Sequence, residues 1–130
     1  MRSIKLIHSA FVIFPLVAGL LIYLLFRTPE TWLHFILNIN TTPFSINSSF
    51  SNFYLFHLPD FLWAFSFSYA VLWSQYPKDK IVRIITIIIF ILFAEFLQLL
   101  LKGATFDWLD ISIELAAAFT AILLFKNPRP

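Results

Sequence analysis

Hydrophobic residues along the chain gather into four long runs that are separated by polar segments. The runs cover residues 7–26, 59–76, 81–101 and 107–125. A helix needs about 20 apolar residues to cross a hydrocarbon layer of about 30 Å, and the runs are close to this length. The pattern therefore predicts an all-α membrane protein with four transmembrane helices.

Proline, glycine and a charged turn mark the boundaries between the runs. Pro59 is a residue that favours the first turn of a helix, so we expect the second helix to begin there. Pro77 and the polar residues 78–80 form the turn before the third helix. Gly103 follows the third run, as glycine often does just past a helix C-terminus.

The first run follows Arg2 and Lys5, as the apolar segment of a secretory signal peptide would. The run is long for that segment, and no small-residue cleavage site follows it. We therefore interpret residues 7–26 as an uncleaved membrane anchor.

Residues 27–58 are polar and irregular, with many Asn, Ser and Pro residues, and we expect them to form a loop outside the bilayer core. Within this loop, residues 31–39 are apolar but too few to span a membrane. They form either a short helix lying in the membrane interface or an ordinary packed loop segment.

Composition excludes a water-soluble fold. The 130 residues are 60% hydrophobic and only 12% charged, whereas soluble domains are about 25% charged. The mean hydropathy is +0.85. We predict a single transmembrane domain over residues 1–130. Because the chain has no cysteine, disulfides, thiolate metal sites and cysteine nucleophiles are excluded.

The basic residues indicate how the chain is oriented. Of the 9 Lys and Arg residues, only Arg27 and Lys102 lie on the side of the 27–58 loop. Basic residues of membrane proteins collect on the cytoplasmic side, so both termini are expected in the cytoplasm and the loop outside. The net charge of +2 therefore reports topology, and we predict no nucleic-acid partner.

Most of the acidic residues map to the outer half of the predicted helices. The five that do so are Asp60, Glu95, Asp107, Asp110 and Glu114. In the fourth helix their spacings of three and four residues place them on one helical face, as Glu95 and Gln98 share a face of the third. The sequence therefore predicts a polar, acidic pocket formed by Asp60, Glu95, Gln98, Asp107, Asp110 and Glu114.

Glu95 is the acidic residue whose burial in the membrane costs the most free energy, because it lies six residues before the outer end of the third helix. A carboxylate in hydrocarbon costs about 2–3 kcal/mol on insertion scales, so we expect it to have a partner. Lys102, Gln98 and the polar stripe of the fourth helix are the candidates. Asp60 and Asp107 have a simpler alternative role, since acids at helix starts cap free N–H groups.

The three histidines are scattered, and only His57, three residues before Asp60, is placed to join the acids. No two histidines lie one helical turn apart, the spacing typical of a metal site. We therefore predict no metal ion and no cofactor.

The second half of the chain resembles the VanZ-like family of small bacterial membrane proteins. The matching motif residues are Glu95, Gln98, Thr105, Phe106 and Asp110. The family's Arg falls on Ala104, its Asn on Glu114, and its glycines on Ala117 and Ala121. The resemblance implies a multi-pass protein of the bacterial inner (plasma) membrane, in a family linked to resistance to the glycopeptide teicoplanin. Losing the Arg and gaining Glu114 would make this pocket more acidic than the family's.

Three functions fit these features. The preferred one is a non-enzymatic envelope component whose pocket binds a lipid-linked precursor or a membrane-protein partner at the outer leaflet. The second is a small cation- or proton-coupled transporter, or a channel subunit that acts as a homo-oligomer. The third is an intramembrane enzyme that uses paired carboxylates on a lipid head group, which no nucleophile motif supports.

Overall fold

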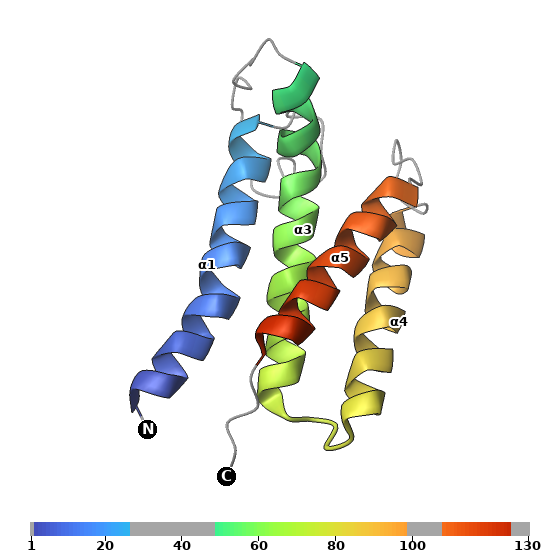
Figure 1. The fold of residues 1–130 in the computed structure, drawn as a ribbon. Coiled ribbons are helices and arrows are strands. Elements are labelled where there is room, and N and C mark those ends of the chain that lie inside the picture. Colours follow the sequence, from blue (N-terminus) through green and yellow to red (C-terminus); the bar gives the residue numbers. More distant parts are fainter. Residues whose placement is uncertain (1, 27–48, 99–107, 126–130) are drawn as a thin grey trace.

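The computed structural model describes residues 2–26, 49–98 and 108–125 (Figure 1). These ranges contain four helices and no strand: α1 (Arg2–Phe26), α3 (Ser49–Ser74), α4 (Lys80–Gln98) and α5 (Trp108–Leu124). The prediction of an all-α protein is thus confirmed for the described residues.

The helices run alternately up and down, and α3 lies at the centre of the arrangement (Figure 1). It packs most extensively against α1 and α5, and it also contacts α4, which touches α5. Because the helix directions alternate, α3 and α5 begin at one end of the bundle, while α1 and α4 begin at the other.

The predicted start of the second helix is wrong. Helix α3 begins at Ser49, so residues 49–58, expected in a loop, are helical and Pro59 lies in the helix interior. Proline there removes one backbone hydrogen bond and crowds the carbonyl four residues earlier. Neighbouring helices can compensate for such a loss, and the Pro59 side chain is fully buried. The remainder of the expected loop, including residues 31–39, lies outside the described residues.

The other boundaries lie close to their expected positions. Helix α1 starts before residue 7 and ends at Phe26 as predicted. Helix α3 ends at Ser74, because Gln75 takes a left-handed conformation with φ of 55° that breaks the helix. Helix α4 starts at Lys80 and helix α5 starts at Trp108, and each start lies one residue from its predicted position.

The core lies where α3, α4 and α5 meet. Its buried apolar side chains are Ala64, Phe65, Tyr69 and Leu72 of α3, Ile87 and Ile91 of α4, and Ala117, Ala118 and Ala121 of α5. The alanines allow the α5 backbone to approach its neighbours closely, as small residues do in membrane helix pairs.

Gly19 is a point of close contact between α1 and α3. A Cβ atom added at Gly19 would lie 3.0 Å from Trp63 Cδ1 and 3.3 Å from Leu62 Cβ. These distances leave no room for a large side chain. Gly19 therefore sets how closely the two helices pack.

The outer surface of the bundle is strongly apolar. Large hydrophobic side chains are exposed on all four described helices, for example Phe14 (74%), Trp63 (50%), Ile89 (60%) and Phe119 (61%). Two segments, Lys5–Phe26 and Leu55–Ser74, are long and apolar enough to cross a membrane. A surface of this kind is far more apolar than the isolated patches that soluble proteins expose.

Candidate functional site

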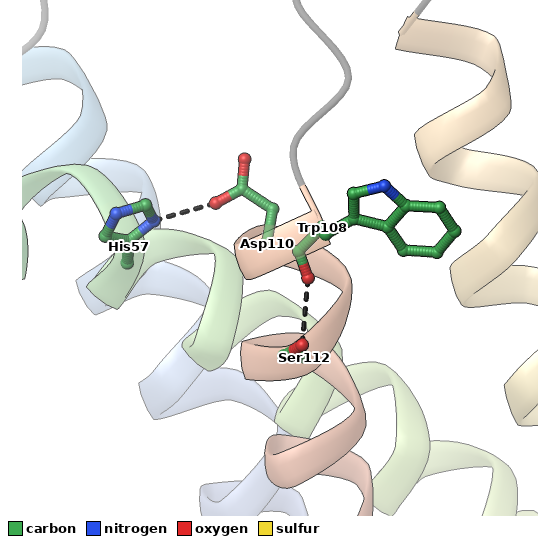
Figure 2. A network of polar contacts seen from close by, with 4 residues as sticks. All are labelled: His57, Trp108, Asp110 and Ser112. Atoms are coloured by element: carbon green, nitrogen blue, oxygen red, sulfur yellow. Dashed lines mark hydrogen bonds and ion pairs between the residues drawn. The ribbon is translucent and has the colours of Figure 1, made fainter.

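Two residues of α3 and one of α5 meet at the end of the bundle where both helices begin. His57 Nδ1 lies 2.7 Å from Asp110 Oδ1, within hydrogen-bonding distance (Figure 2). One potential ligand atom from each of His57, Asp60 and Asp110 lies within 4.8 Å of the other two. We call these three residues the acid–histidine cluster.

Local helix geometry places each member of the cluster. His57 and Asp60 are three residues apart, so they share one face of α3. Asp110 lies in the first turn of α5, where its charge is favourable beside the helix N-terminus. In the same turn Ser112 Oγ donates a hydrogen bond to the Trp108 carbonyl at 2.8 Å (Figure 2). The extensive contact between α3 and α5 then brings His57 and Asp60 close to Asp110.

Two further carboxylates adjoin the cluster from the interior. Glu114 lies one turn after Asp110 on α5 and is only 8% exposed, and Glu95 of α4 is 1% exposed. The charges of Glu95, Asp60 and Asp110 all act on Glu114. Glu114 Oε2 has no hydrogen-bond partner among the described residues. Three helices therefore bring four acids and one histidine into a single electrostatic neighbourhood.

The structure thus groups four of the predicted pocket residues: Asp60, Glu95, Asp110 and Glu114. Asp107, also predicted for the pocket, lies outside the described residues. So does Lys102, a candidate partner of Glu95. Gln98 is the last described residue of α4, and its side chain lies outside the described part. That the grouped residues bind a ligand stays a prediction.

The alternative role considered for Asp60 is wrong. Because α3 begins at Ser49, Asp60 lies in the helix interior, where it cannot cap the N–H groups of the first turn. Its position against Asp110 of another helix requires a different explanation. The spacing in the sequence marked His57 as the histidine placed to join these acids, and the structure groups it with Asp60 and Asp110, although the predicted pocket did not include it.

The opposite end of the bundle holds its polar side chains in a different way. His8 Nδ1 lies 2.8 Å from the Tyr69 hydroxyl, and the imidazole stacks on Trp73 with ring centroids 5.9 Å apart. Arg83, only 6% exposed, donates from Nη1 to the Leu72 carbonyl at 3.0 Å. In these contacts the partners of His8 and Arg83 are neutral groups.

A groove of about 400 Å³ lies between α1 and α3, and its walls are apolar. None of the acid–histidine cluster lines it. The acid–histidine cluster is therefore separate from this groove.

Comparison of the chain with protein-family models, with curated proteins and with solved structures finds no match in any of the three. The resemblance to the VanZ-like family therefore rests on the motif residues alone and stays a prediction. What the site does has to be inferred from its own geometry. An imidazole grouped with several carboxylates is chemically suited to holding a positively charged group.

Proposed function

We propose that this protein is a non-enzymatic, multi-pass membrane component that binds a cationic ligand at its acid–histidine cluster, on the outer side of the inner (plasma) membrane. The observation that carries the proposal is the convergence of His57, Asp60, Asp110 and Glu114 from two helices at one end of the bundle. A VanZ-like envelope role is consistent with this position.

The membrane part of the proposal has four spans, formed by α1, α3, α4 and α5, with both termini in the cytoplasm. Exposed apolar side chains on all four helices support it, since lipid would cover them. Lys5, Lys78, Lys80 and Arg83 all belong to segments at the end opposite the cluster. By the positive-inside rule that end is cytoplasmic, which turns the cluster outward.

The cationic ligand follows from the charges at the cluster. Carboxylates that share a site of low dielectric repel one another, and burial removes the water that would screen them. A bound cation would offset both effects. The ligand is a metal ion, or an ammonium or other basic group presented by a lipid-linked precursor or by a membrane-protein partner.

Topology is tested by labelling single cysteines, because the chain has none of its own. Trp108→Cys lies at the cluster end and Lys78→Cys in the turn at the other end, and both positions are exposed. In intact cells a membrane-impermeant maleimide should label Trp108→Cys only. Labelling of Lys78→Cys should require permeabilised cells, and the reverse pattern would contradict the proposed orientation.

Ligand binding is tested by thermal unfolding of the purified protein with spermidine, hexaamminecobalt(III) and divalent metal ions. At least one of these cations should raise the melting temperature of the wild type. The increase should be lost in Asp110→Asn and kept in Asp79→Asn, whose exposed carboxylate lies at the opposite end. If none of the cations stabilises the wild type, the cation-binding function is wrong.

A second candidate function is cation or proton transport, and a specific observation favours it. Ser68, two turns beyond Asp60, is 0% exposed, and its Oγ has no hydrogen-bond partner among the described residues. Arg83 Nε, nearer the other end, is likewise buried and without such a partner. Buried polar atoms therefore continue past the cluster into the other half of the bundle.

Glu95→Gln separates the two candidates in proteoliposomes. An amide keeps much of the hydrogen bonding of Glu95 but cannot carry a proton or a negative charge. A folded Glu95→Gln protein that has lost a cation or proton flux shown by the wild type would establish transport. Absence of any flux in the wild type would leave the binding role as the better description.

A further inference from the structure

We propose that the cation bound at the acid–histidine cluster is one divalent transition-metal ion, ligated by His57, Asp60 and Asp110. This inference rests on the proposed function, because it identifies the chemical class of the cation. It adds to that function a metal centre that joins α3 to α5.

The donor set selects the class of metal. Imidazole suits Zn²⁺, Fe²⁺ and similar ions, while carboxylates also suit Mn²⁺. Mg²⁺ and Ca²⁺ prefer sites made of oxygen ligands alone. Cu⁺ prefers thiolate and thioether ligands, which the cluster does not offer. One imidazole with carboxylates is thus a set for Zn²⁺, Mn²⁺ or Fe²⁺.

The spacing of the donor atoms is close to what one ion requires. Zn²⁺ binds nitrogen and oxygen at about 2.0–2.2 Å, so neighbouring ligand atoms in a tetrahedral site lie about 3.3 Å apart. In the cluster the separations start at 2.7 Å, between His57 Nδ1 and Asp110 Oδ1, and none exceeds 4.8 Å. A bound metal ion would replace the hydrogen bond between His57 and Asp110. The distance between His57 Nδ1 and Asp110 Oδ1 would then increase slightly.

Glu114 supplies an independent indication of a ligand. Its side chain is more than nine-tenths buried, and its Oε2 has no hydrogen-bond partner among the described residues. Glu114 lies one turn after Asp110 on α5, outside the three residues whose ligand atoms lie within 4.8 Å of one another. The charges of Glu95, Asp60 and Asp110 act on it. A buried carboxylate without a partner is costly, and a metal ion bound at the neighbouring cluster would offset its negative charge.

The experiment titrates the purified full chain with Zn²⁺ and with Mn²⁺ by calorimetry. The wild type should bind one equivalent of at least one of these ions. His57→Gln should weaken its affinity by roughly 100-fold, since losing even an outer-shell partner costs about 10- to 100-fold. His8→Gln is the matched control, because His8 lies at the opposite end of the bundle, and its affinity should equal that of the wild type.

A spectroscopic readout separates ligation from a general effect on the fold. Co²⁺ bound in place of the natural ion should give visible absorption bands that shift in His57→Gln and stay unchanged in His8→Gln. If His57→Gln elutes as an aggregate, Asp60→Asn replaces it, with the same loss of affinity expected. Unchanged affinity in a folded His57→Gln or Asp60→Asn protein overturns the assignment of ligands.

The outcomes also distinguish this inference from the function on which it rests. Hexaamminecobalt(III) keeps its own ligands, so it can be attracted by carboxylates but not ligated by His57. If it stabilises the wild type while Zn²⁺ and Mn²⁺ do not bind, the metal site is wrong and the cation-binding function stands. If no cation of either kind binds, both proposals are wrong.

Discussion

The two ends of the helix bundle each hold a histidine between helices, yet their surroundings are opposite in character. At one end His8 contacts the Tyr69 hydroxyl and stacks on Trp73. At the other end His57 contacts the Asp110 carboxylate, with Asp60 within ligand distance. The first set of contacts is neutral and aromatic, whereas the second gathers negative charge.

The difference shows which end is organised for stability and which is not. A hydroxyl and an aromatic ring contact His8, and a backbone carbonyl accepts a hydrogen bond from Arg83 Nη1, so these contacts place no like charges together. The four acids near His57, which are Asp60, Glu95, Asp110 and Glu114, repel one another, and apolar packing would stabilise the fold better there. Clusters of this kind are typical of functional sites, where stability is given up for binding.

The largest effect is expected from Ala117→Leu, which should disturb the packing of α5 on α3. Ala117 is 0% exposed and belongs to the core between α5 and α3. A larger side chain there should push α5 away from α3, at a cost of about 1–3 kcal/mol in unfolding free energy. Both the melting temperature and its increase on cation binding should fall. The neighbouring Ala116→Leu, at an exposed position, should change neither.

Gly19→Leu is the converse test, with a somewhat smaller expected effect of about 1–2 kcal/mol. The new side chain would meet Trp63 and Leu62 and displace α1 from α3. The cost is limited because Trp63 is 50% exposed and has room to move. Since the cluster is formed by α3 and α5, the melting temperature should fall while the cation-induced increase keeps its full size. Loss of that increase would show that the two ends are coupled.

Tyr69→Phe removes the hydroxyl that contacts His8. The loss of one hydrogen bond between membrane helices should cost about 0.6 kcal/mol, measured by chemical unfolding. The response to cations should be unchanged. Tyr76→Phe, at a position 78% exposed, serves as the control for removing a tyrosine hydroxyl. A response to cations that changed only in Tyr69→Phe would mean that the end of the bundle with His8, Tyr69 and Trp73 contributes to cation binding.

The smallest effect is expected from Asp79→Asn, at most about 0.5 kcal/mol. Asp79 Oδ1 accepts a hydrogen bond from the Ile81 N–H at 2.7 Å, just before α4. Asparagine caps helices as well as aspartate does, so removing this charge should leave stability almost unchanged. A clear loss of stability in an unfolding titration would show that the charge, and not the hydrogen bond, holds this turn.

Helix boundaries were predicted well where the apolar runs were long. The prediction failed for the start of α3, where polar residues of the helix precede the apolar run. The run at residues 7–26 gave the end of α1 at Phe26. Residues 49–58 begin with Ser, Phe, Ser and Asn, and Pro59 follows, so turn signals outweighed helix signals. Burial of Pro59 against the neighbouring helices is a tertiary effect that a local pattern does not contain.

The candidate site was predicted in part for a similar reason. Helical spacing alone placed Asp110 and Glu114 on one face, and the structure brings both of them beside Asp60. The contribution of His57 depends on how α3 crosses α5, which no spacing within one helix reveals. Asp60 was assigned a capping alternative only because the start of its helix was placed ten residues too late.

The central position of α3 has a consequence for biosynthesis. Because α1 and α5 both pack on α3, a nascent chain that contains only α1 and α3 can already form the contact between His8 and Tyr69. His57 and Asp60 have then been synthesised, but Asp110 and Glu114 follow only with α5. The acidic residues are therefore not assembled until translation of α5 is finished, and a nascent chain spends its early life without the repulsion that the mature protein has to tolerate.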